Sequence, residues 1–255
     1  MKYRAPKTAI AGLKTSGCMK LLFPQVQEDA MTAVTLNTAG GITGGDQLKL
    51  NVSVGEAAHL RLTTQAAERV YRAHPGEVGS VDTQLQIAAG ARLDWLPQET
   101  ILFDHGALNR RLTIDMARDA RLLLVEPLVF GRAAMGEVIT QITLRDHLTV
   151  HRDGTLIFAD ALRFDGDLHQ QMQRAALGGG AGAMASALLA STEAECEALL
   201  PKLRAMLPDT AGVSLLRPGL LFLRAVAADG FDLRRVLIPA LTLMNGAALP
   251  RTWMI

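Results

Sequence analysis

Apolar residues recur in short alternating runs along the first two thirds of the chain, and four of these runs are built alike. In each, an alternating strand leads into a tight turn marked by a small residue, and apolar residues follow two and four positions later. The small residues are Ala58, Ala91, Ala120 and Gly154, which lie 33, 29 and 34 residues apart. Period-two spacing places both following side chains on one face of a strand. The pattern therefore predicts four similar β units in series.

Each unit reads as a hairpin-like pair of strands that can bury its apolar face only by stacking on its neighbours. The upstream strands alternate in the same way, at positions 48–54, 81–87, 108–114 and 142–150. We predict a mainly β fold with a stacked β-hairpin or β-helix-like body over about residues 1–190. An ordinary β-sandwich is the alternative, because evenly spaced short strands are typical of that architecture as well.

Helical periodicity is confined to the last third of the chain. Thr192 and Glu195 form a capping box ahead of an amphipathic run. A second run of helical spacing extends over residues 232–246 and ends in Asn-Gly, a common helix terminator. We therefore expect about two helices in a C-terminal part, about residues 191–255, within a single domain of residues 1–255.

Composition places the chain among globular proteins and argues against several classes of partner. Hydrophobic residues make up 49% and charged residues 20%, and 26 basic residues oppose 25 acidic ones. No basic excess is available for nucleic acid. The most apolar stretch, 215–228, is interrupted by arginines and is too short to span a bilayer. With no signal-peptide pattern and only two cysteines, the sequence predicts a cytoplasmic protein.

Sequence motifs of known catalytic sites are absent. The chain has no Gly-x-Ser-x-Gly, His-Glu-x-x-His, Cys-x-x-Cys or Gly-Lys-Ser/Thr motif. His147 and His151 stand four apart, but in a strand that spacing separates them by about 13 Å, too far to share a metal ion. We predict that the chain is not an enzyme and binds no cofactor tightly.

The densest local signal is a glycine-rich segment that contains Gly40, Gly41, Gly44 and Gly45. Two such pairs require unusual backbone angles or a very close approach of backbone to a neighbour. Three interpretations remain open. The segment is a nucleotide loop, although the lysine of such loops is missing; a structural bend without a ligand; or a loop that presents Asp46 and bare amides to a partner or a passing cation.

Acidic residues lie at or beside the predicted strand ends, among them Glu126 and Glu137. Glu126 follows its small turn residue by six positions, so the stack is expected to carry a row of polar end residues. The equivalent positions of the other units are Thr64, Pro97 and Asp160. Carboxylates alone form a weak, exchangeable site for a divalent ion, whereas tight nickel sites recruit His or Cys. The alternative for each carboxylate is solvation or pairing with an arginine.

Five blocks of the sequence, in order, resemble the UreD (UreH) family of urease accessory proteins. They are residues 37–48 with the core Gly-Gly-Ile-Thr-Gly-Gly-Asp, and residues 62–72, 95–103, 131–137 and 249–253. The resemblance covers nearly the whole chain. It implies an all-β, helical-stack fold with a few helices, in agreement with the repeat.

The same resemblance implies a function in nickel insertion into urease. It implies complex formation with UreF and the GTPase UreG, docked on apo-urease with its UreA, UreB and UreC subunits, and a homodimer of this complex is a further expectation. A UreD-like chain is expected to offer a polar passage to transient nickel, which makes Asp46, Glu126 and Glu137 candidates for the passage lining. The alternative is a carbohydrate-active or structural β-solenoid without a metal role.

Overall fold

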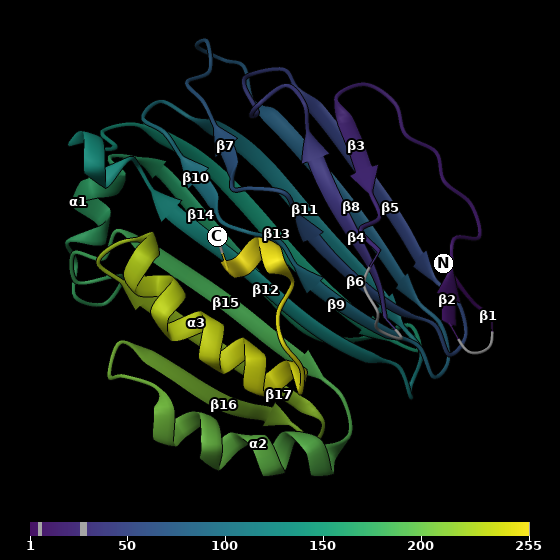
Figure 1. The fold of residues 1–255 in the computed structure, drawn as a ribbon. Coiled ribbons are helices and arrows are strands. Elements are labelled where there is room, and N and C mark those ends of the chain that lie inside the picture. The colour runs from purple at the N-terminus through teal and green to yellow at the C-terminus, as the bar shows by residue number, and fades with distance from the viewer. Residues whose placement is uncertain (5–6, 26–29, 255) are drawn as a thin grey trace.

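Two β sheets stacked face to face make up most of the molecule, and two helices cover the outer face of the larger sheet (Figure 1). The computed structural model describes residues 1–4, 7–25 and 30–254. The predicted mainly β fold with C-terminal helices is confirmed. The smaller sheet contains β5 (Gln47–Val54), β8 (Gly79–Ile87), β11 (Ala107–Met116), β13 (Ile142–Arg152) and β14 (Thr155–Gly166).

The larger sheet has ten strands among the described residues. They are β3 (Met19–Leu22), β4 (Met31–Asn37), β6 (His59–Thr64), β7 (Glu68–Val70), β9 (Arg92–Leu96), β10 (Thr100–Leu102), β12 (Arg121–Phe130), β15 (Ala183–Ala190), β16 (Ala211–Arg217) and β17 (Leu220–Ala227). A separate pair, β1 (Lys2–Arg4) and β2 (Lys7–Ala9), lies near the N-terminus.

The strands of the first three units are not paired within their own unit, so the hairpin prediction is wrong for those units. Instead β5, β8, β11 and β13 run parallel in the smaller sheet, and β6, β9 and β12 run parallel in the larger one. Each turn carries the chain from one sheet to the other. Alternation in the sequence reports the face of a strand but not its partner, and parallel stacking satisfies the backbone through the next unit. Only the fourth unit, β13–β14, is an antiparallel hairpin among the four.

The small turn residues explain the repeat. Ala58, Ala91 and Ala120 are buried, and each donates its backbone N–H to the carbonyl three residues earlier at 3.1 Å. The three turns therefore stack as near copies, and a larger side chain would meet the core. The fourth unit departs from this pattern: Gly154 is exposed with φ +73°, and Leu156 is 50% exposed.

The C-terminal third contains α2 (Glu193–Met206) and α3 (Gly230–Asn245), and a short helix α1 (Leu168–Met172) precedes it. The hydroxyl of Thr192 accepts a hydrogen bond from the Glu195 N–H at 3.2 Å, as the capping box predicts. Helix α3 begins two residues before the predicted start, because the Asp229 carboxylate accepts the Asp232 N–H and caps it there. The left-handed Gly246 ends it.

The sequence does not predict β16 and β17, which extend the larger sheet as an antiparallel hairpin. Helices α2 and α3 pack on the outer face of that sheet and enclose one apolar cluster. Two further clusters lie between the sheets. Two 3-10 turns, η1 (Ala133–Met135) and η2 (Arg251–Met254), complete the described elements. No helix within residues 1–4, 7–25 and 30–254 is both long and apolar enough to cross a membrane.

Candidate functional site

The apolar core between the two sheets is divided by a layer of polar side chains. On β12, Leu124 belongs to one apolar cluster and Leu128 to the other, with Glu126 between them. On β11, Arg110 likewise separates Leu112 of the first cluster from Leu108 of the second. We call these residues the polar layer: Thr35, Thr64, Glu126, Ser186 and Arg224 of the larger sheet, and Arg110, Asp146 and Asp160 of the smaller sheet.

Strand register places most members of the polar layer at one level. In the smaller sheet Arg110 is paired with Asp146, and Asp160 lies two residues further along, opposite Leu148. In the larger sheet, Thr35 is paired with Thr64, Glu126 with Ser186, and Ser186 with Arg224. Because side chains on paired positions point to the same side of a sheet, these groups all face the interior between the sheets. The polar layer thus crosses the strands rather than running along them.

At the middle of the polar layer, Arg110 joins carboxylates from both sheets. Its Nη1 lies 2.6 Å from Oε2 of Glu126, and its Nε donates to Oδ1 of Asp146 at 3.0 Å. Trp95 Nε1–H donates to the other oxygen of Glu126 at 2.6 Å, and Thr100 accepts from Arg110 at 3.3 Å. The group is one cation between two anions, with a formal charge of −1.

Burial and neighbouring charges shift the pKa values of this group. Burial raises the pKa of Glu126, and the nearby charge of Asp146 adds to that effect, while Arg110 opposes it. Burial acts to lower the pKa of Arg110, but Asp146 and Glu126 outweigh it, so the Arg110 pKa lies above its ordinary value. Arg110 is therefore a permanent cation, and Glu126 is protonated more easily than an ordinary glutamate.

A cavity of about 390 Å³ opens onto this group. Its lining includes Thr64, Pro97 and Glu126, so three of the four positions in the predicted row share one cavity, while Asp160 lies on the opposite sheet. Exposed residues, among them Gly40, belong to the lining as well. The cavity therefore connects the glycine-rich segment with the centre of the polar layer.

The other end of the polar layer is a second ion pair. Arg224 contacts the carboxylate of Asp160 and donates to the Ser186 hydroxyl at 3.0 Å. The side chains of Arg224 and Asp160 are 36% and 23% exposed, respectively, so this end reaches solvent. Polar groups thus extend from the cavity on one side to a partly exposed ion pair on the other.

The structure does not bring the three predicted carboxylates together. Glu126 lines the cavity, whereas Asp46 accepts the Thr43 N–H at 2.9 Å within its own loop. Glu137 pairs with Arg132 at 2.9 Å, over a shallow surface hollow. The Arg132 hydrogen bond, with help from backbone N–H groups, lowers the pKa of Glu137. Across the described residues, no group of three or more His, Cys, Asp or Glu side chains could hold a metal ion.

The glycine-rich segment packs against β7 and the loop that follows it. A Cβ on Gly41 would lie 2.3 Å from the Tyr71 ring and 2.8 Å from the Arg69 carbonyl oxygen, and one on Gly44 would lie 2.5 Å from Cβ of Glu77. Gly40 and Gly45 both adopt φ +81°, while a Cβ on either would meet nothing within 4 Å. Close packing and left-handed backbone therefore account for the four glycines as a structural bend, and Gly40 additionally lines the cavity.

Sequence reasoning missed Arg110 and Asp146. Both stand at inward positions of alternating strands, where the pattern calls for an apolar side chain. A charged residue at such an inward position is the sequence feature that could have identified them as site residues. What the sequence could not give was their contact, because it depends on the parallel register that places Arg110 beside Asp146.

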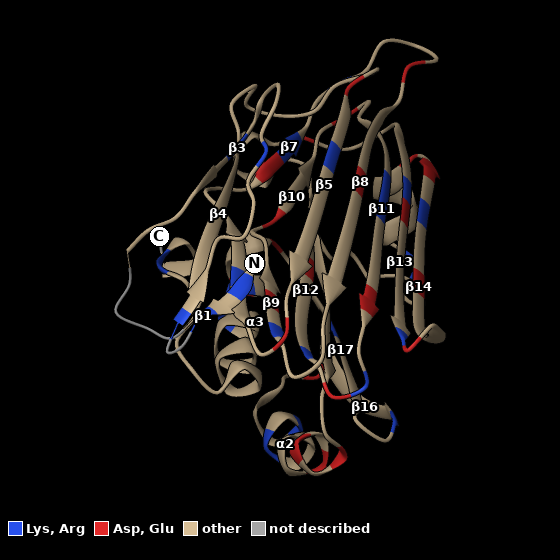
Figure 2. Ribbon diagram, turned by 90° about the vertical axis from the view of Figure 1, so that its right-hand side faces the viewer, with Lys and Arg blue, Asp and Glu red and all other residues tan. Residues whose placement is uncertain are grey.

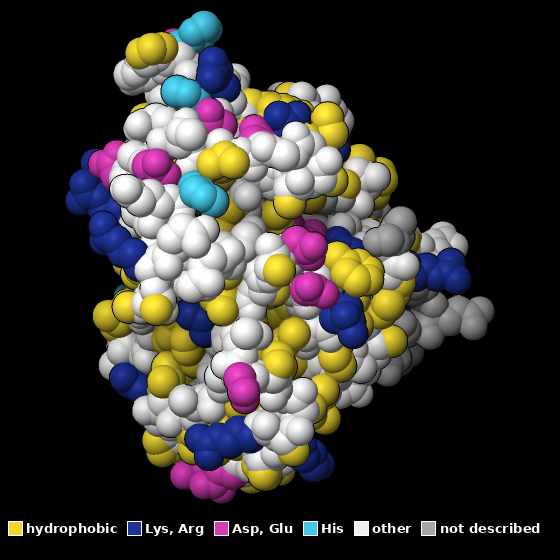
Figure 3. All heavy atoms as spheres, turned by 90° about the vertical axis from the view of Figure 1, so that its left-hand side faces the viewer, with side chains coloured by type: hydrophobic (Ala, Val, Ile, Leu, Met, Phe, Trp, Pro, Cys, Tyr) yellow, Lys and Arg dark blue, Asp and Glu magenta, His cyan; other side chains and the backbone are white. Residues whose placement is uncertain are grey.

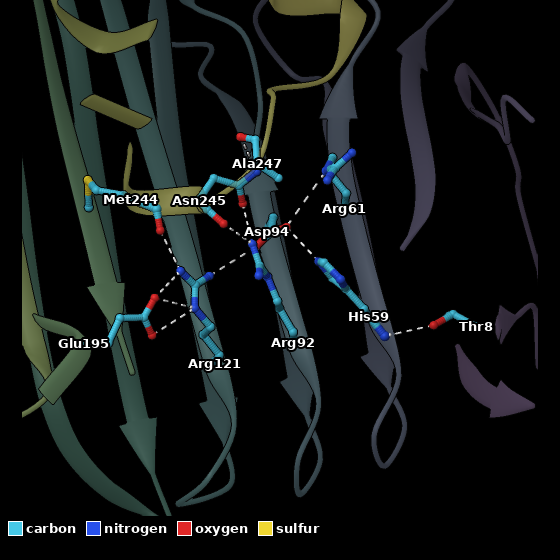
Figure 4. A network of polar contacts seen from close by, with 10 residues as sticks. All are labelled: Thr8, His59, Arg61, Arg92, Asp94, Arg121, Glu195, Met244, Asn245 and Ala247. Carbon is cyan, nitrogen blue, oxygen red and sulfur yellow. Dashed lines mark hydrogen bonds and ion pairs between the residues drawn. The ribbon is translucent and has the colours of Figure 1, made fainter. Parts of the chain in front are cut away.

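A second ionic network lies on the outer face of the larger sheet (Figure 4). The fully buried Asp94 carboxylate has Nε2 of His59 at 2.8 Å and Nε of Arg92 at 2.9 Å, with Nη1 of Arg121 at 3.6 Å. Arg92 and Arg121 also donate to the last carbonyls of α3, those of Asn245 and Met244, at 2.7 and 2.6 Å. This network fastens α3 to the sheet.

Charges of both signs are interspersed on the surface. Figure 2 shows both blue and red segments scattered over the strands of the smaller sheet. On the face that Figure 3 presents, apolar, acidic and histidine side chains are mixed. This distribution agrees with the near-neutral charge of the chain and gives no single-sign stripe on these faces.

Comparison with known proteins gives a consistent result. The family model described as UreD urease accessory protein matches residues 1–254. Urease accessory protein UreD of Ruegeria pomeroyi is 48% identical over 248 residues, which cover 97% of this chain and 96% of that protein. The proteins of the same name from Roseobacter denitrificans and Sinorhizobium medicae are 45% and 43% identical, covering 96% and 97% of this chain and 89% and 90% of their own lengths.

Proposed function

The chain belongs to the UreD family of urease accessory proteins, with a role in urease maturation, and we propose that it is a scaffold through which nickel reaches apo-urease. It acts in a complex with UreF and the GTPase UreG, in the cytoplasm, and catalyses no reaction of its own. The relatives are named accessory proteins, which supports a role beside urease rather than as an enzyme.

The observation that carries this proposal is the polar layer. Core between two sheets is normally apolar, because a buried polar group must find a partner there. Here charged groups interrupt the core in a band across the strands, from a cavity at Gly40 to the partly exposed pair of Asp160 and Arg224. Oxygen ligands hold a borderline metal such as nickel weakly, so such a layer favours transfer over storage.

The arrangement gives no support to the carbohydrate-active alternative. A glycosidase needs two carboxylates that flank an open groove and act on a substrate between them. Glu126 and Asp146 instead bind one guanidinium, that of Arg110. Of the predicted passage residues, Glu126 is the one on which the proposal rests, and Asp46 and Glu137 stay predictions.

The test is urease activation with a charge-neutral variant of the polar layer. Urease subunits, UreF and UreG are co-expressed with the chain or with Glu126→Gln, and nickel per urease active site and urease activity are measured. We expect both to fall by about tenfold, because the exchangeable oxygen ligand at the cavity is lost. Glu197→Gln, on the exposed face of α2, is the matched control and leaves both unchanged. Full nickel loading with Glu126→Gln would contradict the proposal.

The partners are tested separately by co-purification. The tagged chain is isolated from cells that contain or lack UreF and UreG, and bound apo-urease is quantified. We expect urease to be retained, and more of it with both accessory proteins present. If a tagged, unrelated β-solenoid protein retained an equal amount of urease, the association would be non-specific.

A further inference from the structure

Arg110 is a fixed cation in the middle of the layer that we assign to nickel transfer. Its guanidinium contacts one carboxylate from each sheet, Glu126 on β12 and Asp146 on β13. All three side chains are only 12–13% exposed. A pure transfer layer has no obvious need for a permanent positive charge, because that charge repels the passing ion.

Without this arginine, the two carboxylates would form a binding site for a metal ion. They approach from opposite sheets toward one point, and the Thr100 hydroxyl lies beside it, within 3.3 Å of Arg110 Nη1. Two buried anions facing each other are costly unless a cation lies between them. A divalent ion is the alternative occupant, and two facing carboxylates in the low-dielectric interior would hold it more firmly than a single exposed carboxylate does.

We propose that Arg110 is a built-in competitor that occupies the place between Glu126 and Asp146 and keeps a metal ion from being retained there. An arriving ion contacts Glu126 only while it displaces the guanidinium in part, and the returning guanidinium expels it. Arginine suits this role because it is always charged and is more weakly hydrated than an ammonium group. The inference rests on the proposed function, since it explains how a layer that accepts nickel avoids storing it.

The competing explanation is that Arg110 has only a structural role and stabilises the contact between the two sheets. Metal binding and urease activation together separate the two explanations. Loss of Arg110 frees both carboxylates in either case, but only the loss of a competitor is expected to hold back nickel that would otherwise reach urease. The full-length chain, purified with the accessory proteins that accompany it, is equilibrated with Ni²⁺ alone and the bound metal is counted. Arg110→Met keeps an unbranched apolar stem while removing the charged guanidinium group. We expect it to gain one Ni²⁺ site per chain, at least about tenfold tighter than any site of the unaltered chain at this place.

Matched variants assign the gained site. Arg110→Met combined with Asp146→Asn or with Glu126→Gln loses it again, and Arg110→Lys, which keeps the charge, does not acquire it. If Arg110→Met does not fold, as judged by circular dichroism, Arg110→Gln gives the same readout with a side chain that still donates to a carboxylate. A folded neutral variant that gains no Ni²⁺ site overturns the inference.

Urease activation at limiting nickel provides the second readout. We expect Arg110→Met to lower it by about fivefold or more while nickel stays on the chain, which corresponds to about 1 kcal/mol of added retention. A gained site with undiminished activation overturns the inference too. Failure of the proposed function is distinguishable, because it appears as full activation by Glu126→Gln in a chain that retains Arg110.

Discussion

Two ionic networks lie on opposite faces of the larger sheet, and they differ in how completely their charges are enclosed. On the outer face, Asp94 is fully buried beneath α3, with His59, Arg92 and Arg121 around it (Figure 4). On the inner face, Glu126 shares Arg110 with a second carboxylate and borders a cavity. The two networks differ in composition as well as in enclosure, because three basic side chains surround one anion in the outer network and two anions share one cation in the inner network.

The pKa shifts of the two carboxylates show what this difference means. Burial alone would raise the pKa of Asp94, but the hydrogen bond from His59 and the charge of Arg92 lower it below its ordinary value. The pKa of Glu126 is raised, because burial and Asp146 together exceed the effect of Arg110. The outer network therefore stabilises its anion and the fold, whereas the inner one leaves its anion under-compensated. An under-compensated anion beside a cavity is available to a cation from outside.

The largest expected effect is on the outer network. Asp94→Ala leaves the partly buried Arg92 and Arg121 without their central anion, and we expect it to lower the free energy of unfolding by about 3–5 kcal/mol. Urea denaturation followed by circular dichroism measures this. Asp94→Asn, which keeps the shape, is expected to cost less. A loss no larger than that of the exposed Glu197→Ala would show that the outer network does not hold the fold together.

A smaller loss of stability is expected on the inner face. Glu126→Gln keeps an oxygen that accepts from Trp95, and Arg110 keeps Asp146, so the free energy of unfolding falls by only about 1 kcal/mol. The same denaturation experiment provides the comparison with Asp94→Asn. If the inner substitution proves the more destabilising of the two, the distinction between a structural and a functional network fails.

The pH dependence of stability should differ in sign between the two networks. The folded pKa of Asp94 lies below its ordinary 3.8, so its contribution is present above that value and is lost as pH falls through the folded pKa. The folded pKa of Glu126 lies above 4.5, so the folded state takes up its proton first and gains stability as pH falls through that pKa.

Denaturation series of the unaltered chain, Glu126→Gln and Asp94→Asn measure this difference. From neutral pH down to about pH 5, the stability of the unaltered chain should rise relative to Glu126→Gln and stay constant relative to Asp94→Asn. Below about pH 4, it should fall relative to Asp94→Asn. Parallel curves for all three proteins would contradict the assigned shifts.

The smallest effect on stability is expected at the glycine-rich segment. Asp46→Asn keeps an oxygen that accepts the Thr43 N–H, so stability should change by less than about 0.5 kcal/mol. The variant therefore isolates the charge of Asp46 in urease activation. A reduced nickel content of urease would extend the passage to this loop, and an unchanged content would confine it to the cavity and the polar layer.

Periodicity in the sequence predicts the repeating strands and helices well, but it does not predict which distant element packs on the outer face of a strand. Leu93 and Trp95 are recognisable as an inward pair, so Asp94 between them reads as a solvated outer residue. It is buried because α3, from 136 residues later, covers that face. Likewise, Glu126 is found from its place in the repeat, whereas Arg110 and Asp146 meet it only through long-range register.

The parallel stacking of the units sets the width of both sheets. Each additional unit adds one strand to each sheet, and neighbouring strands lie about 4.8 Å apart. Because the polar layer crosses the strands, its length depends on the number of stacked units and not on the length of any strand. The antiparallel β13–β14 hairpin ends the parallel series in the smaller sheet, so the number of repeats sets the length of the polar layer there.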